Sequence, residues 1–437
     1  MDKIASASDI NNPNYLYMER LPQFYLRGLE LMKDKEGQSE YANYQNSLGT
    51  TYWKLSDREK ETNLKQAINA FSEALKVRTF EKFPKDYAQT QNNLGIAYWD
   101  LSYVREKEEN LKHAIKCYDE ALKVYNFEQF PQEYARTRNN LGFAYRDLSE
   151  IRDKETNLKH TINACNEVLK VYTIEQFPYD YALTNKNLGN AYWSLSEVRG
   201  KEVNLECAIE CYNEALKDRT FEQFPYDYAQ TMNNTGNAFR DLSEVKDKEV
   251  NFKRAIECYN EALRVYTPKE FPQDYARIQA NLGITYWRLS EAGNKEANLE
   301  RAIEYYNKAL RIRTFEQFPY DYARTQNNLG IAYRDSSYVR EKEENLNRAI
   351  NAYKEALKVY TKEVLPYYFV GTSYNLAMAL SMRGDKAGAV KVMEEMLPVA
   401  EEVGHPKLEE YRRFYEKEQK GLQTFIIDKS ASTPLII

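Results

Sequence analysis

Apolar side chains recur along most of the chain at spacings of three and four residues, which is the period of an amphipathic helix. In one clear copy the apolar face is formed by Tyr87, Thr90, Leu94, Ala97, Tyr98 and Leu101. A charged stretch from Ser102 to Glu109 interrupts the period, and a second face follows between residues 111 and 125. The pattern predicts two helices of about 19 and 16 residues, with connections of about seven and five residues.

The two-helix pattern returns every 47 residues. Its start is marked by a Phe-Pro pair at Phe83, Phe130, Phe177, Phe224, Phe271 and Phe318, and once by Leu365-Pro366. Proline suits the first turn of a helix, so the pair is predicted to begin the first helix. An Asn that recurs from Asn63 to Asn345 is predicted to cap the second helix. A glycine inside the first helix, such as Gly95, predicts close approach of a neighbouring helix.

A fixed period of this length is typical of a solenoid, in which each repeat packs on the next. We expect an all-α solenoid of about eight repeats over residues 41–397. Residues 1–40 are expected to hold an N-terminal segment and a capping helix, in which Pro22 is a break or a first-turn position. Residues 398–420 are expected to form a C-terminal capping helix, near 406–419, and the structure of the tail at 421–437 stays open.

The residues of a repeat resemble the tetratricopeptide-repeat pattern. In one copy they are Leu94, Gly95 and Tyr98 in the first helix and Ala114, Tyr118 and Ala121 in the second. The repeat is longer than the usual family unit of about 34 residues. The chain is similar to kinesin-light-chain-like arrays and to prokaryotic arrays associated with caspase-like proteases. This resemblance implies a right-handed superhelical solenoid that binds peptides or partner proteins in its concave groove.

The composition narrows the expected partners. Lys and Arg total 61 against 66 Asp and Glu, a balance that disfavours nucleic acid and anionic membranes. The sequence has no apolar run long enough to span a membrane and no apolar leader segment, so we expect a cytoplasmic protein. Five cysteines without a framework spacing are expected to be small, reduced core residues.

No arrangement of residues in the sequence indicates catalysis. His113 and His160 hold the same position in successive repeats, which an exposed helix face explains most simply. Phosphate-binding loops, paired-cysteine metal motifs and nucleophile elbows do not occur. We therefore expect no enzyme activity, no catalytic residue, no metal and no cofactor. The charged loops, for example at Lys107-Glu108, are expected to be solvated and to pair between repeats.

One polar column in the first helix is the main candidate for ligand binding. It consists of Asn93, Asn140, Asn187, Asn234, Asn281, Asn328 and Asn375. Asn is a poor helix former, so a freely solvated helix face does not account for its recurrence. In tetratricopeptide repeats this position faces the groove, where an amide can bond both N–H and C=O of an extended peptide. The alternative is that each Asn bonds a neighbouring helix within the stack.

Two further columns flank the Asn column. Arg136, Arg277 and Arg324 stand four residues before it. Six residues after it Trp and Arg alternate, as Trp99, Arg146, Trp193, Arg240, Trp287 and Arg334. These side chains could form cation–π contacts that connect adjacent repeats. They could equally be binding residues, because Trp and Arg are enriched at interaction hot spots.

The charges expected on this face give a preference for the ligand. Nine cations are counted there, namely Lys54, Arg136, Arg146, Lys186, Arg240, Arg277, Arg288, Arg324 and Arg334. Four carboxylates oppose them, at Asp100, Asp147, Asp241 and Asp335. The excess favours an acidic peptide or one that ends in a free carboxylate. The function expected is a protein-interaction scaffold, and the alternative is a regulatory or sensor subunit that controls a separate effector such as a protease.

Overall fold

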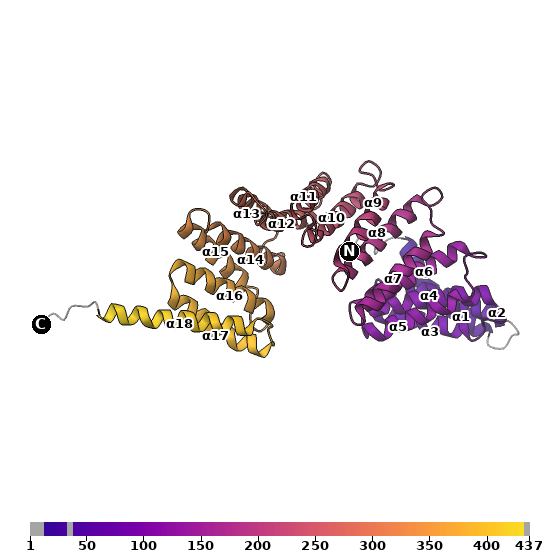
Figure 1. The fold of residues 1–437 in the computed structure, drawn as a ribbon. Helices are drawn as coiled ribbons and strands as arrows, with labels where there is room; N and C mark the ends of the chain where they lie inside the picture. The colour runs from indigo at the N-terminus through magenta and orange to yellow at the C-terminus, as the bar shows by residue number, and fades with distance from the viewer. Residues whose placement is uncertain (1–12, 33–37, 432–437) are drawn as a thin grey trace. The chain divides into compact units, whose positions relative to one another are not determined.

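The computed structural model describes residues 13–32 and 38–431, with side chains described for 20–31 and 38–422. The described residues form helices joined by short connections, and no strand occurs among them. The helices follow one another along the chain as antiparallel pairs (Figure 1). The chain divides into two compact units, residues 1–220 and 221–437, and each is described by itself.

The first unit begins with α1 (Pro13–Met32), which packs against α2. Four helix pairs follow: α2 (Gln38–Lys54) with α3 (Lys60–Leu75), α4 (Pro84–Ser102) with α5 (Lys107–Leu122), α6 (Pro131–Ser149) with α7 (Lys154–Leu169), and α8 (Pro178–Ser196) with α9 (Lys201–Leu216). The expected break at Pro22 is wrong, because α1 continues through it. Leu29 and Tyr25 hold the helix against Leu48 and Tyr44 of α2, which offsets the hydrogen bond that the proline removes.

The second unit also contains four described pairs. They are α10 (Pro225–Leu242) with α11 (Lys248–Leu263), α12 (Pro272–Leu289) with α13 (Lys295–Leu310), α14 (Pro319–Ser336) with α15 (Lys342–Leu357), and α16 (Pro366–Arg383) with α17 (Lys386–Glu402). A further helix, α18 (Leu408–Ala431), packs against α17 and is longer than the predicted 406–419. We call the first helix of each pair helix A and the second helix B.

The glycine of helix A makes room for an aromatic ring of helix B. A Cβ at Gly95 would lie 2.6 Å from the ring of Tyr118, and Gly283 faces the ring of Tyr306 in the same way. Both rings are buried. Close approach of the paired helices was predicted from the glycine, and it is confirmed here.

The connection between helices A and B is shorter than predicted. Between α4 and α5 it runs from Tyr103 to Glu106, and Glu106 has the left-handed φ of 46° that turns the chain into α5. Asn110 therefore lies beyond the helix start, and its Nδ2 donates 2.8 Å to the carbonyl of Arg105. The predicted capping role of this Asn is wrong: it closes the loop from inside the helix.

Most A helices contact the next helix A of their unit. In the first unit α2 contacts α4 and α4 contacts α6, and in the second α10, α12, α14 and α16 contact one another in series. Each helix A also packs against the preceding helix B of its unit, as α4 does against α3. The fold is an all-α solenoid of stacked helix pairs, as the repeat pattern predicted.

Candidate functional site

The predicted Asn column lies on the A helices, and all of its members are partly buried. Asn93 is on α4, Asn140 on α6, Asn187 on α8, Asn234 on α10, Asn281 on α12, Asn328 on α14 and Asn375 on α16. A partly buried amide that is also partly accessible can bond both the stack and a ligand. Its hydrogen bonds decide which of these it does.

Three members of the column bond the preceding repeat. Asn140 Nδ2 donates 3.3 Å to Asn92 Oδ1, Asn281 Nδ2 donates 3.2 Å to Asn233 Oδ1, and Asn375 Nδ2 donates 3.3 Å to Asn327 Oδ1. The stack-bonding alternative therefore holds for the N–H groups of these three residues. The acceptors were not predicted, although their recurrence directly before the Asn column was visible in the sequence.

Three other members have no such bond among the described residues. Asn328 faces a repeat that carries Ala280 at the acceptor position, so no side-chain oxygen is available there. The Nδ2 of Asn187 is buried and has no hydrogen-bond partner among the described atoms. Asn93 likewise has no described side-chain hydrogen bond. We call Asn93, Asn187 and Asn328 the unbonded set, and Asn140, Asn281 and Asn375 the bonded set.

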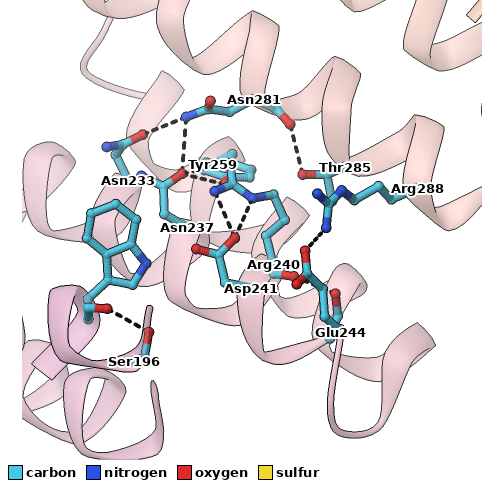
Figure 2. Close-up of polar contacts among 12 residues, drawn as sticks. Ser196, Asn233, Asn237, Arg240, Asp241, Glu244, Tyr259, Asn281, Thr285 and Arg288 are labelled. Carbon is cyan, nitrogen blue, oxygen red and sulfur yellow. Dashed lines mark hydrogen bonds and ion pairs between the residues drawn. The ribbon is translucent and has the colours of Figure 1, made fainter. Parts of the chain in front are cut away.

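A polar network in the second unit shows how the face is held (Figure 2). Asn237 Oδ1 accepts hydrogen bonds from Tyr259 at 2.8 Å, Arg240 at 3.3 Å and Asn281 at 3.3 Å. Tyr259 comes from helix B and is buried, and its burial raises its pKa to about 12. Because the network joins α10, α11 and α12, the side chains on this face are fixed by the stack.

The Trp column connects successive A helices by hydrogen bonds to Asp. Trp53 Nε1 donates 2.6 Å to Asp100, Trp99 donates 2.8 Å to Asp147, and Trp287 donates 2.8 Å to Asp335. Trp193 occupies the same position on α8 and is partly buried. Burial raises the pKa of Asp100, against the lowering effect of the Trp53 hydrogen bond.

The predicted Trp–Arg stacking needs correction within the first unit. Arg146 lies over the Phe143 ring, 5.1 Å from its centroid, and the Trp99 ring stacks on the same Phe143 at 6.2 Å. The connection between repeats is instead carried by the buried carboxylate of Asp147, which accepts from both Trp99 and Arg146. A carboxylate is a charged acceptor for both the buried indole N–H and the guanidinium, and an aromatic ring face offers no such acceptor.

The arginines of this face are mostly paired with carboxylates. Arg146, Arg240 and Arg334 bond the Asp that follows each of them. Arg277 pairs with Asp274, Arg324 with Asp321 and Arg288 with Glu244. Counting these three further acids lowers the excess of positive charge from about five to about two. Arg136 is exposed. The predicted strongly positive face is therefore not observed.

Metal-ligating side chains do not gather in the described part of the chain. No set of three or more His, Cys, Asp and Glu side chains is placed there to hold a metal ion. His113 is exposed and stacks on Tyr98. Burial raises the pKa of the Cys117 and Cys165 thiols to about 12, so both are protonated at neutral pH. None of the described helices has the length and apolar character needed to cross a membrane.

Family models for the tetratricopeptide repeat match three segments. Residues 91–127 and 277–314 match one model, and residues 372–403 match a second. The first segment covers most of α4 and α5, the second α12 and α13, and the third α16 and α17. The comparison with curated proteins gives no significant match.

Solved structures with a similar arrangement have low sequence identity. A signal transduction ATPase with numerous domains and a tetratricopeptide repeat sensor, from Pyrococcus horikoshii, is 15% identical with a TM-score of 0.49, over 88% of this chain and 56% of that one. The apo form of RapI is 16% identical with a TM-score of 0.48, over 88% and 98%. BtubC (BKLC) from P. vanneervenii is 20% identical with a TM-score of 0.41, over 57% and 92%.

The family matches agree with the packing of the described helices. Each matched segment spans one A–B pair, and the glycine and aromatic positions of the predicted pattern meet in the core of the pair, as Gly95 and Tyr118 do. The chain therefore contains tetratricopeptide repeats, arranged as a solenoid of helix pairs.

Proposed function

We propose that the chain is a non-enzymatic scaffold for protein–protein interaction whose A-helix face binds an extended segment of a partner protein. Tetratricopeptide repeats are interaction modules, and the family matches supply that general role. The finer proposal, that the Asn column holds the partner's backbone, rests on the hydrogen bonds of the column itself.

The observation that carries the proposal is the acceptor that two of the bonded Asn residues keep, since the Oδ1 of the third, Asn375, accepts from Arg334 at 3.4 Å. Asn140 and Asn281 donate to the preceding repeat through Nδ2, and their Oδ1 atoms accept no hydrogen bond from the described residues. The stack thus fixes the amide and leaves its oxygen for a ligand N–H. Neighbouring A helices lie about 10 Å apart, and an extended peptide advances about 3.3 Å per residue. One ligand residue in about three would meet the column.

A preference for acidic ligands is not part of this proposal. Six of the nine cations counted on the face already bond a carboxylate of the chain, as Arg277 does with Asp274. A carboxylate of the ligand would have to displace that partner. The lost internal ion pair would offset most of the binding free energy gained from the new one.

The unbonded set gives a test that separates ligand binding from stability. We expect the triple variant Asn93→Ala, Asn187→Ala, Asn328→Ala to lose the partners that the intact chain captures from cells, with an unchanged melting temperature. Asn140→Ala, Asn281→Ala, Asn375→Ala should lower the melting temperature as well, because it breaks the bonds between repeats. The matched control is Asn213→Ala, Asn260→Ala, Asn307→Ala, three exposed positions on helices B.

Retention of the captured partners by both the unbonded-set and the bonded-set variants would contradict the proposal. The Asn column would then serve only the stack. A regulatory or sensor subunit would use the same face, and the captured partner distinguishes the two roles. An effector enzyme whose activity changes on binding indicates a regulator, and partners that are only brought together indicate a scaffold.

A further inference from the structure

Arginines in the connections between helices A and B pair with glutamates of the preceding repeat. The pairs are Arg105 with Glu61 at 2.7 Å, Arg152 with Glu108 at 2.8 Å, Arg199 with Glu155 at 2.6 Å and Arg340 with Glu296 at 3.5 Å. In every pair the arginine follows its glutamate by 44 residues. We call this series the arginine ladder. The glutamates come from the first turn of helix B.

The ladder is interrupted at Gly293. This residue stands 44 positions after Glu249, where the other repeats carry a basic side chain. A Cβ at Gly293 would meet no atom within 4 Å, and the residue does not have the positive φ that a side chain would oppose. Among the described residues Glu249 keeps only the ion pair with Lys253, at 2.7 Å, and its side chain is 58% exposed. The side chains of the glutamates that pair with a ladder arginine are between 35% exposed, at Glu155, and 54% exposed, at Glu296.

A cavity of about 330 Å³ lies where the arginine is missing. Its charged wall holds Glu249 and Glu257 beside Lys253 and Arg301, and Ile256 and Leu289 supply apolar surface. Tyr286 also lines the cavity, and its hydroxyl accepts a hydrogen bond of 3.1 Å from the guanidinium of Arg301. We call this cavity the Gly293 notch. All of its walls belong to α11, α12, α13 and the connection between the last two.

We propose that the Gly293 notch receives an arginine side chain of a partner protein, which completes the ladder from outside. The guanidinium pairs with Glu249 as the chain's own arginines pair with Glu108 and Glu155. Ile256 and Leu289 contact the aliphatic part of the arginine. Arginine fits better than lysine, because its planar fork can bond a carboxylate through two N–H groups while Lys253 keeps its own bond.

This notch goes beyond the proposed role of the A-helix face. Glu249, Glu257 and Ile256 belong to a helix B, so the Asn column takes no part in it. Failure of either proposal leaves the other standing, since the variants that test them do not overlap.

The probe is the blocked tripeptide acetyl-Ala-Arg-Ala-amide, added to the full chain with labelled Ile and Leu methyl groups. We expect saturable NMR shifts at Ile256 and Leu289. Gly293→Arg fills the notch with the residue that other repeats carry, and Glu249→Gln removes the acceptor. Each should weaken binding by about tenfold or more. The same tripeptide with citrulline, which has the shape of arginine without its charge, should not bind, and the lysine tripeptide should bind more weakly.

A transplanted notch serves as the gain-of-function control. Ile151→Ala with Arg152→Gly copies Ala292-Gly293 into another repeat and frees Glu108 from its ladder arginine. We expect this variant to bind a second equivalent of the arginine tripeptide. The proposal is overturned if the shifts persist in Gly293→Arg, or if the citrulline or lysine tripeptide binds as tightly. Free arginine that binds tenfold tighter than the blocked tripeptide would also overturn it, by indicating a small-molecule site.

Discussion

Cys165 takes the place of an aromatic ring that six other repeats bury at the same position. Those rings belong to Phe71, Tyr118, Tyr212, Tyr259, Tyr306 and Tyr353. A Cβ at Gly142 would meet no ring but the Ala164 Cβ at 3.2 Å and the Thr161 carbonyl oxygen at 3.9 Å, whereas one at Gly95 would meet the Tyr118 ring. A small cavity of about 10 Å³ remains beside Gly142 and Cys165. The pair α6–α7 therefore packs with less apolar contact than its neighbours.

We expect Cys165→Phe to stabilise the chain by about 1 kcal/mol, because it restores the ring that other repeats pack against the glycine of helix A. Phe suits the site better than Tyr. In other repeats Asn190 and Asn237 accept the hydrogen bond of the ring hydroxyl, and Phe143 stands at that position here. Thermal and urea unfolding of Cys165→Phe, with Cys165→Ala as the control that enlarges the cavity, measures the effect. A lower stability of Cys165→Phe would mean that Phe143 and Arg146 already occupy the volume that the new ring needs.

Backbone preference predicted some single residues and misled at others: the glycine of helix A marked close packing, whereas Pro22 does not break α1 and Asn110 does not cap α5. Asn is unfavourable within a helix, so its recurrence correctly marked a polar position on helix A. Its partners depend on how far one repeat is rotated on the next, which the period alone does not give. The bond from Asn281 to Asn233 was therefore missed, although both residues recur in the sequence.

Helices α4 and α6 are connected through one buried carboxylate. Asp147 is 3% exposed and accepts from Trp99, Tyr103 and Arg146. Trp99→Phe keeps a ring against Phe143 and removes one donor, so we expect a loss of about 1–3 kcal/mol. In the Asp147→Asn background the same change should cost less, because the charged acceptor is already gone. Urea unfolding of wild type, the two single variants and the double variant gives the coupling free energy between Trp99 and the charge of Asp147. Additive losses would show that this charge does not strengthen the Trp99 hydrogen bond.

The arginine ladder makes part of the stability depend on pH. Hydrogen bonds from Lys159 and Arg199 lower the pKa of Glu155 from its ordinary value of 4.5 to about 2. The folded pKa is the lower one, so this contribution is present above pH 4.5 and is lost as the pH falls toward 2. Arg199→Gln should lower the melting temperature at pH 7, and the difference from wild type should shrink below pH 4.5. An equal difference at pH 7 and pH 3 would contradict this account.

Helix type and order followed from the apolar period, and the helix ends did not. The stretch from Ser102 to Glu109 is charged, which indicated a loop, but α5 already begins at Lys107. Its charged side chains point to solvent from the first turn, where the pattern has no buried position to reveal a helix. The left-handed residue that starts α5 is Glu106, which the sequence does not mark, since glycine takes this place only at Gly200 among the described helices B.

The described helices contact their near neighbours along each unit. In the first unit α4 packs with α3 and α5 and touches α2 and α6, and α12 has the corresponding neighbours in the second. Contacts of this kind make stability a sum of repeat terms and interface terms. The 47-residue period was sufficient to predict such an array, because stacking is the way for repeats of this size to bury their apolar faces. The division into two compact units was not predicted.

Local unfolding should therefore depend on position within each unit. An inner pair has a repeat on both sides, whereas α2–α3 and α16–α17 are each followed outward by a single helix, α1 or α18. We expect amides of α4 to α7 to exchange more slowly than those of α2 and α3, and those of α12 to α15 more slowly than those of α16 and α17. Native-state hydrogen exchange with mass spectrometry measures this directly.

Cys165→Phe should slow exchange in α6 and α7 and leave α16 and α17 unchanged, because interface terms reach only adjacent repeats. A single opening free energy shared by every helix would instead show that the chain unfolds as one cooperative body.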